Sequence, residues 1–296
     1  MTPRVGLTLP SFQSEPERVL EVARAAEDAG LDGVFLFDHL FRQRGDAADA
    51  ERRPALELLT MTAAVAAATR RLAVGTLVAR ATLRPPATTR AAFDTLARLA
   101  PGRIIAGLGG GDEESIAEDR AFGVLPADPE PAGTQDTGRQ ALGAYRVAQL
   151  HTTVEALAGR EYPVWVAGRS PAAFRLAANT ADGWNHWGSV PAAFTAAADR
   201  LRAELANAGR DPLAFTYTWG GLAVLAPTPA EAAAKWDRLG GNRPGIIKGD
   251  PQQAAEQIGA YADAGADWVI LGPIDSANPD NAAVLGKAVR VLRGSA

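Results

Sequence analysis

The sequence predicts an α/β protein built as a single (β/α)8 TIM barrel over residues 1–296. Short apolar runs alternate with helical stretches along the whole chain, which is typical of parallel strands joined by helices. In addition, a nine-residue pattern recurs near the start, the middle and the end of the chain. That recurrence favours one ring of similar units over two unrelated halves.

The recurrent pattern reads DAGxDxVxL. It covers residues 28–36 and 263–271, and residues 177–185 form a looser third copy. Each copy joins the end of a helix to a short cap and then to a buried strand. Three such junctions indicate that the chain repeats one structural unit from end to end.

Eight apolar runs are expected to form the barrel strands, and each is followed by a stretch with helical spacing. The strands lie near Val5, Val34, Leu72, Ile104, Val164, Gly183, Phe215 and Val269. The helices cover residues 16–29, 54–69, 86–100, 139–157, 171–179, 191–208, 229–239 and 251–264, and a terminal helix covers 281–293. Residues 123–138 are rich in Pro, Gly and Asp and interrupt the fourth unit. We expect them to form a surface loop or short lid rather than a domain linker.

Composition excludes several classes of function. The formal net charge is −4 and no basic run is present, so partners such as nucleic acid or an anionic membrane are not expected. No apolar run reaches the roughly 18 residues that span a bilayer, and MTPRVGLTLP is too short and polar for a secretion signal. The sequence therefore predicts a cytoplasmic protein. Because the chain has no cysteine, it has no disulfides, thiolate nucleophiles or iron–sulfur ligands.

The turn after the fifth expected strand is a candidate phosphate site. An apolar run at residues 164–167 ends in Gly168, Arg169 and Ser170, and Pro171 then opens a helix. Ser170 fits the N-cap position, and Pro171 fits the first helical position. The unpaired N–H groups and the positive dipole end of a helix N-terminus attract an anion. The alternative is an ordinary strand-to-helix turn without a ligand.

Small residues also follow other expected strands, where the active site of such a barrel lies. The glycines in residues 107–111 would let a flat or phosphorylated ligand approach the main chain closely, although tight turns also use glycine. The segment is not a dinucleotide fingerprint, because Asp112 stands where GxGxxG requires its last glycine.

Asp38 and His39 directly follow the second expected strand and are the sharpest chemical feature. Histidine suits proton transfer near neutral pH, and a neighbouring carboxylate could orient it or contact a ligand. The alternative is a solvated turn or a satisfied hydrogen-bond pair. Of the other histidines, His151 is expected on a helix surface, and His186 could line or support the pocket.

Other catalytic chemistries find little support in the residues. Three scattered histidines, no cysteine and no HExxH do not support a zinc site, and we expect no metal. No GxSxG elbow occurs. Few carboxylates follow strands, so a glycosidase pair could be built only from Asp38 with Asp112 or Glu113.

Five segments, in order, match a known family. They are ARAAEDAGLDGVFLFDHLF, AVGTLV, RPPATTRAAFDTLARLAPGRIIAGLGGGDEES, PVWVAGRSPAAFRLAANTADGWN and GDPQQAAEQIGAYADAGADWVILGP. Over nearly its whole length the chain resembles the luciferase-like flavin and deazaflavin oxidoreductases, and in particular the branch that uses coenzyme F-420.

The resemblance implies that the C-terminal face of the barrel holds the tricyclic ring of coenzyme F-420. Asp38 would contact the deazaflavin, and His39 would donate or accept a proton beside the carbon that exchanges hydride. Leu77 and Val78 match a bulge after the third strand that often carries a cis peptide bond not involving proline. Phosphate contacts are implied at Ala167, Gly168, Arg169 and Ser170. Further contacts near the ring are expected at Gly107, Gly109, Asp112 and Ser115.

Departures from the family pattern bear on cofactor and substrate. Flavin monooxygenases of the superfamily tend to carry Glu-His-His where this chain has Asp-His, which favours the deazaflavin over FMN. Sugar-phosphate dehydrogenases carry a lysine shortly after the sixth strand, whereas this chain has Trp187, Gly188, Ser189 and Val190. A sugar 6-phosphate substrate is therefore disfavoured. Arg169 replaces a frequent glycine and could add a charged contact or point outward.

The resemblance implies hydride transfer between the deazaflavin and a carbonyl, imine or activated alkene. His39 would supply one proton, and Trp187 and Trp219 would form part of an apolar rim. One alternative is an FMN-dependent monooxygenase that works with a partner reductase. Another is a protein that binds the deazaflavin without catalysis. Family members are commonly homodimers, so a homodimer is expected.

Overall fold

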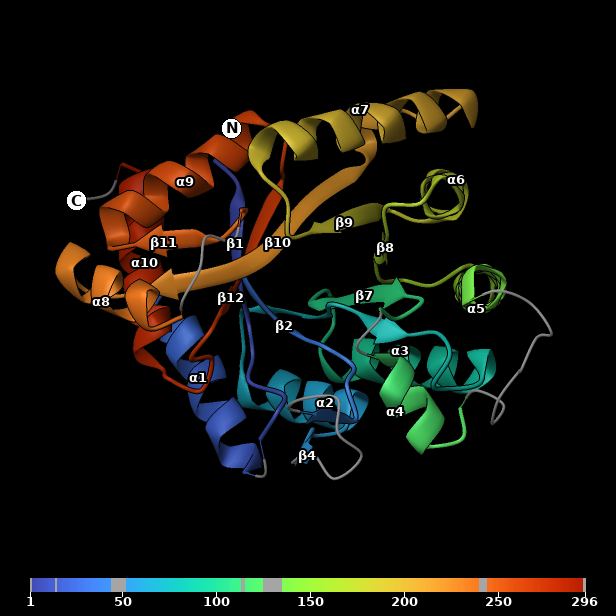
Figure 1. Cartoon of the computed structure of the whole chain (residues 1–296), viewed down its shortest axis with the longest axis horizontal. Coiled ribbons are helices and arrows are strands. Elements are labelled where there is room, and N and C mark those ends of the chain that lie inside the picture. The colour runs from blue at the N-terminus through green and yellow to red at the C-terminus, as the bar shows by residue number, and fades with distance from the viewer. Residues whose placement is uncertain are drawn as a thin grey trace.

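Eight parallel strands close into the ring that the sequence predicts (Figure 1). The computed structural model describes residues 2–13, 15–43, 52–112, 115–124, 135–239 and 244–294. The barrel strands are, in order around the ring, β1 (Arg4–Thr8), β2 (Gly33–Leu36), β5 (Ala73–Thr76), β7 (Ile104–Gly109), β8 (Val164–Ala167), β9 (Gly183–Trp187), β10 (Thr216–Leu225) and β12 (Trp268–Pro273). Parallel pairing of β12 with β1 closes the ring. The predicted fold class is confirmed.

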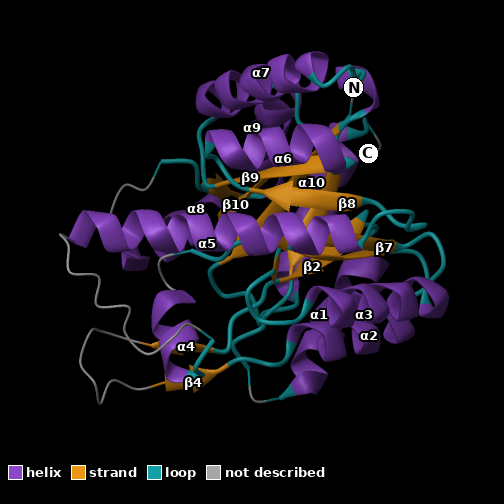
Figure 2. Cartoon of the chain, turned by 90° about the vertical axis from the view of Figure 1, so that its right-hand side faces the viewer, coloured by secondary structure: helices purple, strands orange, loops and turns teal. Residues whose placement is uncertain are grey.

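Helices cover the outside of the strands (Figure 2). They are α1 (Pro16–Asp28), α2 (Leu58–Ala68), α3 (Pro86–Leu99), α4 (Ser115–Ala121), α5 (Gln135–Ala156), α6 (Pro171–Thr180), α7 (Pro191–Asn207), α8 (Pro229–Leu239), α9 (Pro251–Asp263) and α10 (Asp280–Leu292). A short 3-10 helix covers Pro212–Ala214. Across the described ranges, none of the helices is both long and apolar enough to cross a membrane.

The predicted start of α2 is wrong. Residues 52–54 form β4 (Arg52–Pro54), which pairs antiparallel with β3 (Phe41–Gln43). The helix begins only at Leu58, because the carboxylate of Glu57 caps it by accepting the Thr60 N–H at 2.7 Å. The hairpin lies between β2 and α2 in the sequence, at the end of the barrel where loops follow strands.

Besides the β3–β4 hairpin and the 3-10 helix, three further short elements were not predicted. β6 (Ala79–Arg80) pairs with β7, β11 (Ile247–Gly249) pairs with β10, and α4 follows β7. In the predicted loop at residues 123–138, residues 125–134 lie outside the described residues. Residues 135–138 belong to α5, so this helix begins four residues earlier than expected.

In each copy of the repeated pattern, the aspartate directly before the strand holds the start of a neighbouring strand. The pairs, from carboxylate Oδ2 to backbone N–H, are Asp32 with Val5 at 2.8 Å, Asp182 with Val164 at 2.8 Å and Asp267 with Tyr217 at 2.7 Å. In each pair, the strand that is held lies beside the strand that follows the aspartate. The repeat therefore fixes strand register at the amino end of the barrel, which serves stability rather than the active site.

Large aromatic rings fill the interior of the barrel. The ring of Phe35 lies 5.7 Å from that of Trp165 and 5.5 Å from that of Trp268. Inward-facing glycines make room for them, because a Cβ atom on Gly75 would lie 2.6 Å from Phe35 and one on Gly183 would lie 2.5 Å from Trp165. Real Cβ atoms do not approach other atoms so closely, so these positions require glycine.

Replacing Gly75 with Ala is expected to lower the free energy of unfolding by about 1–3 kcal/mol, because the added methyl group overlaps the Phe35 ring. Chemical denaturation measures the change. Gly143→Ala is the matched control, since no atom lies within 4 Å of a Cβ there. Because Ala favours a helix over Gly by about 1 kcal/mol, that control should be neutral or stabilising. Equal midpoints for wild type and Gly75→Ala would contradict the packing argument.

Candidate active site

The two segments singled out from the sequence lie at the same end of the barrel. Asp38 and His39 follow β2, and the turn of Gly168, Arg169 and Ser170 follows β8. All strands of the ring are parallel, so the loops after them meet at the C-terminal face. The structure therefore brings the predicted proton-transfer pair and the predicted phosphate turn to one face.

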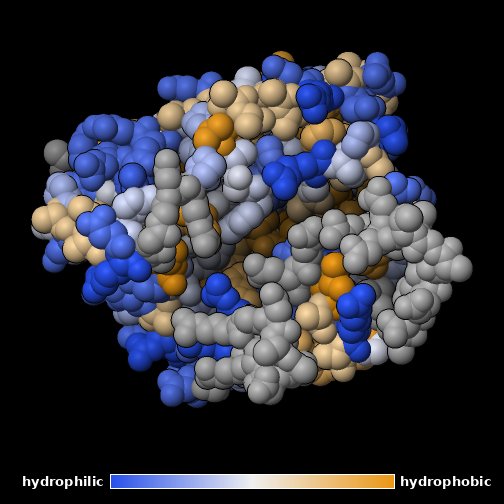
Figure 3. All heavy atoms as spheres, viewed as in Figure 1, coloured by the Kyte–Doolittle hydropathy of each residue, from blue (hydrophilic) through white to orange (hydrophobic). Residues whose placement is uncertain are grey.

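One predicted rim aromatic lines the mouth of the barrel, and the other does not. The indole of Trp187 lies over the main chain of Gly220 and Gly272 and is 41% exposed. The prediction for Trp219 is wrong, because its ring is fully buried and stacks on Tyr261 in the layer between barrel and helices. Figure 3 shows that the viewed face is hollowed near its centre and that hydrophobic colour deepens within the hollow.

His39 is held by a carboxylate from α4. Its Nδ1 donates to Oε1 of Glu118 at 2.6 Å, and the other Glu118 oxygen accepts the Leu40 N–H at 2.8 Å. The imidazole also packs against Phe12 and Phe37, with ring centroids at 5.5 and 5.7 Å. Because Nδ1 is engaged, Nε2 is the nitrogen left to exchange a proton with a ligand.

Glu118 belongs to a buried charge network. Arg80 donates to Glu118 at 2.9 Å and to Asp119 at 3.0 Å, and all three residues are less than 5% exposed. Arg146 of α5 adds a second guanidinium near Asp119 at 3.4 Å. Buried charges require such partners, so the network fixes α4 against the barrel mouth. This network was not predicted from the sequence, because its members lie far apart in the chain and the short helix α4 was not expected.

The network changes the acidity of the imidazole. Burial disfavours the charged ring, but the hydrogen bond to Glu118 and the charges of Glu118 and Asp112 outweigh burial and the opposing charge of Arg80. The pKa of His39 is therefore raised above its usual value. A larger fraction of the rings than usual is protonated near neutral pH, which suits a proton donor.

Asp38 is buried and already paired. Its carboxylate accepts the Arg80 N–H at 2.9 Å and two N–H groups of Arg84 at 2.6 and 3.1 Å. Arg84 also pairs with Glu57, and although burial opposes it, these two carboxylates raise the pKa of Arg84. Asp38 thus anchors the segment that carries His39. Its expected contact with a cofactor stays a prediction.

Neighbouring atoms of the chain itself explain why two positions of β7 are glycine. A Cβ atom on Gly107 would lie 2.0 Å from the carbonyl oxygen of Thr76, and one on Gly109 would lie 2.5 Å from Val78. The peptide bond between Leu77 and Val78 is cis, as the resemblance implies. The bulge after β5 therefore fills the space in front of these glycines. Their expected cofactor contacts stay predictions.

Asp112 and Ser115 cap α4 reciprocally. The Ser115 N–H donates to the Asp112 carboxylate at 2.9 Å, and the Ser115 hydroxyl donates to the Asp112 carbonyl at 2.7 Å. Ser115 is fully buried and also accepts from Arg146 at 3.0 Å, whereas Asp112 is exposed. In this arrangement Ser115 supports the loop, and only Asp112 is open to solvent.

The predicted phosphate turn has the expected local geometry. Ser170 is the N-cap of α6 and accepts the Ala173 N–H at 3.1 Å, and Pro171 occupies the first turn. Gly168 has a φ of +147°, and a Cβ atom there would lie 2.7 Å from the Ala173 side chain, so glycine is required. Arg169 and Ser170 are exposed. Because Pro171 has no N–H and Ser170 engages those of Ala173 and Phe174, the N–H of Ala172 is the one in this turn left to meet an anion.

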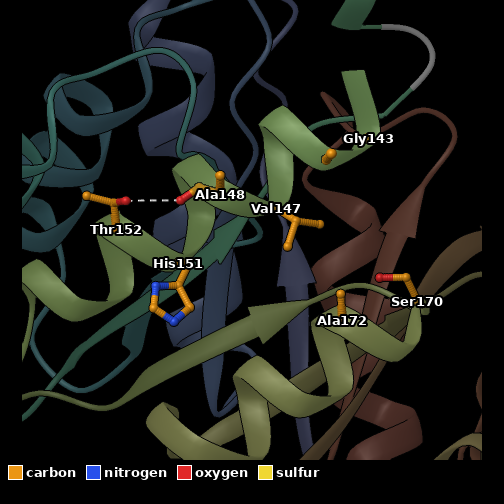
Figure 4. Close-up of a pocket in the computed structure, with 8 residues that line it drawn as sticks. Gly143, Val147, Ala148, His151, Thr152, Ser170 and Ala172 are labelled. Atoms are coloured by element: carbon orange, nitrogen blue, oxygen red, sulfur yellow. Dashed lines mark hydrogen bonds between the residues drawn. The ribbon is translucent and has the colours of Figure 1, made fainter. Parts of the chain in front are cut away.

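A groove of about 760 Å³ adjoins this turn (Figure 4). Gly143, Val147 and His151 line it at successive i, i+4 positions of α5, and Ser170 and Ala172 line it from the start of α6. Most of the lining is apolar. His151 lies on the helix surface, as predicted, with 52% of its side chain exposed.

His186 is buried behind the turn rather than in the mouth. Its ring packs between Trp184 at 5.2 Å and Phe194 at 6.1 Å, and neither ring nitrogen has a partner within the described residues. Burial, with a smaller effect of the Arg169 charge, lowers the pKa of His186 to about 4. The ring is therefore neutral at ordinary pH, which fits support of the site and not direct proton transfer.

Comparisons with known proteins agree with this geometry. The F-420-dependent glucose-6-phosphate dehydrogenases of Beutenbergia cavernae and Nakamurella multipartita are each 30% identical to the chain, over 90% of the chain and 90% of each relative. Among solved structures, an F-420-dependent secondary alcohol dehydrogenase bound to an F-420–acetone adduct has a TM-score of 0.73 at 18% identity, covering 99% of this chain and 100% of that one.

A long-chain alkane monooxygenase is similar in fold, with a TM-score of 0.71 at 15% identity, covering 99% of this chain and 92% of that one. At such low identity the solved structures show the shared barrel alone. The sequence model of the family described as luciferase-like monooxygenase matches residues 2–246. Taken with the 30% identity over nine-tenths of two relatives, this match shows that the chain is an oxidoreductase of the luciferase-like monooxygenase family.

Proposed function

We propose that the protein transfers a hydride between coenzyme F-420 and a carbonyl, imine or activated alkene, with His39 exchanging the accompanying proton. The observation that carries the proposal is the His39–Glu118 pair, which stands on the same face of the barrel as the Gly168–Ser170 turn. In the direction of alcohol oxidation, the substrate hydroxyl would give its proton to His39, and a bound deazaflavin would accept the hydride from the substrate carbon. Reduction reverses both transfers.

The residues present fit the cofactor. Arg169 and Ser170 are exposed where a phosphate would approach, and the N–H of Ala172 at the start of α6 is left as a donor. When bound, the deazaflavin supplies or accepts the hydride. The Gly143–Val147 groove continues beyond Ser170, which suits a cofactor that extends past its phosphate, as F-420 does and FMN does not. The relatives named for F-420 support the same choice.

Residues of the protein orient His39 for the proton transfer. Glu118 holds Nδ1 of His39, so the proton moves at Nε2. The rings of Phe12 and Phe37 fix the plane of the imidazole and limit water around it. Asp38, clamped by Arg84, holds the backbone from which His39 projects. Orientation of this kind lowers the barrier without new chemistry from the protein.

Fluorescence titration of the purified protein with F-420 and with FMN tests the cofactor. F-420 is expected to bind at least about tenfold more tightly, a difference of about 1.4 kcal/mol. Tighter binding of FMN would instead support the alternative, an FMN-dependent monooxygenase with a partner reductase. Tight F-420 binding without turnover of alcohols, carbonyls, imines or alkenes would support a non-catalytic binding protein.

The groove beside the turn provides a second test of the cofactor. Ala144→Glu adds a negative charge to the groove and is expected to weaken binding of F-420 more than that of FMN, because FMN ends at its phosphate. Gln149→Glu adds the same charge to α5 outside the groove and serves as the control. Equal losses for both cofactors, or no loss for F-420, would argue against this path.

Removal of the imidazole should separate chemistry from binding. His39→Ala is expected to lower kcat by about 10²–10⁴-fold while the F-420 dissociation constant stays nearly unchanged. His39→Gln, which keeps much of the size and one polar contact, should be similarly slow because it cannot exchange a proton. Stopped-flow kinetics of F-420 oxidation and reduction measures both. Full turnover in either variant would remove His39 from the reaction.

The Glu118 carboxylate should set the pH dependence. It raises the pKa of His39, so Glu118→Gln is expected to lower that pKa. In the reducing direction, which needs protonated His39, the loss of kcat/KM at alkaline pH would then begin at lower pH. The exposed Glu161→Gln change is the charge-matched control. An unshifted profile in Glu118→Gln would show that Glu118 does not tune the proton donor.

A further inference from the structure

A second hollow of about 520 Å³ is lined on one side by Phe12, whose ring packs against His39. It is formed by the loop after β1, by the start of α1, by the β3–β4 hairpin and by the loop after β12. The side chains that matter to its chemistry are Phe12, Arg18, Arg42, Arg53 and Asp275.

The hollow is electropositive. Its one carboxylate, Asp275, is already engaged by Lys235 at 2.9 Å and by Asn281 at 3.2 Å. Arg18 pairs with Glu21 at 2.5 Å, but Arg42 and Arg53 form no ion pair with any residue in the described parts of the chain. Among the described residues, therefore, two exposed guanidinium groups lack an ion-pair partner and can meet a ligand.

The hairpin brings these two positive charges together. In the antiparallel register of β3 and β4, Arg42 stands directly opposite Arg53. Like charges directly opposite each other on paired strands destabilise a hairpin. An anion seated between the two guanidinium groups would remove that repulsion and gain charge-assisted hydrogen bonds. The arrangement is thus costly without an anionic ligand and favourable with one.

The hollow is next to the proton-transfer residue. The guanidinium carbon of Arg42 lies 5.8 Å from the ring centre of Phe12, and the His39 ring centre lies 5.5 Å from the same point. The positive charge and the imidazole therefore share one aromatic neighbour, which brings them within reach of the two ends of one extended small molecule.

The hollow is on the other side of the barrel from the phosphate turn. β1 and β12, which carry two of its loops, are neighbours in the ring, and β8, which carries Gly168, is the fourth strand from β1 in either direction. A cofactor phosphate at Gly168 cannot also occupy the hollow. The groove that would take the part of the cofactor beyond that phosphate lies along α5, so an anion in the hollow would belong to the substrate.

We infer that Arg42 and Arg53 bind an anionic group, a carboxylate or a phosphate ester, at one end of the substrate while His39 serves the reacting carbon at the other. The inference rests on the proposed function for the reaction, and on the hairpin alone for the anion. It names a substrate class: organic acids or phosphate esters that also carry a hydroxyl, carbonyl, imine or activated double bond.

Calorimetric titration of the F-420-loaded protein with inorganic phosphate at low ionic strength tests the anion site. Wild type is expected to bind phosphate, and the double variant Arg42→Gln/Arg53→Gln is expected to bind it about tenfold or more weakly. Arg200→Gln, an exposed arginine on α7, is the control and should bind as wild type does. Absence of binding to wild type, or equal binding to the double variant, would overturn the site.

Two further measurements assign the anion to the substrate. F-420 affinity should be the same in wild type and the double variant; a selective loss of F-420 affinity would assign the arginines to the cofactor and overturn the inference. Turnover is compared between aliphatic alcohols and hydroxy acids or phosphate esters of equal chain length. The wild-type kcat/KM is expected to favour the anionic member, and the double variant is expected to lose about tenfold of that preference.

An equal kcat/KM preference for the anionic substrate in wild type and the double variant would also overturn the inference. Failure of the proposed reaction appears differently, as no turnover of any compound while phosphate still binds to wild type and not to the double variant.

Discussion

The candidate site depends on two adjacent carboxylates, Glu118 and Asp119, that are buried against Arg80. Removing one partner of such a buried pair leaves an uncompensated charge and costs about 3–5 kcal/mol. The three groups therefore fix one another, and with them the short helix α4 at the mouth of the barrel. Arg80 binds Oε2 of Glu118 and Oδ1 of Asp119, so Oε1 of Glu118 is left to accept from His39. The ion pair that fixes the helix thus also orients the imidazole.

The two histidines near the mouth show how burial alone does not decide a pKa. In His39 the Glu118 carboxylate outweighs burial and the pKa rises, so its contribution to stability is complete below the unfolded value near 6.5 and is lost as pH rises through the folded value. His186 has no such partner, and burial lowers its pKa to about 4. Its contribution is complete above about 6.5 and is lost as pH falls toward 4. His39 therefore suits proton exchange, and His186 suits a neutral, structural role.

Local sequence patterns predicted the strands of the barrel, but they could not predict contacts between residues that lie far apart in the chain. All eight strands were found because each is a short apolar run beside a cap, and the repeated aspartates mark the same junction, where Asp32 and Asp267 hold neighbouring strands. The β3–β4 hairpin and α4 were not predicted. The Glu118 network was not predicted either, because His39 and Glu118 are 79 residues apart and no spacing in the sequence links them. Trp219 was misplaced because side chains alternate along β10, and its ring faces the helices rather than the mouth.

Glycine in β7 illustrates why a small residue at a barrel mouth does not by itself indicate a ligand. The space beside Gly107 and Gly109 is taken by the chain's own bulge at residues 76–78. A ring bound in the mouth would therefore lie against the Val78 side chain and not on the bare strand. Exposed backbone that can meet a ligand remains at Arg169 and Ser170, at the start of α6 and across the ring from β1 and the arginine hairpin. Under the proposed function, opposite sides of one barrel thus recognise cofactor and substrate separately, and the β2 loop between them supplies the proton.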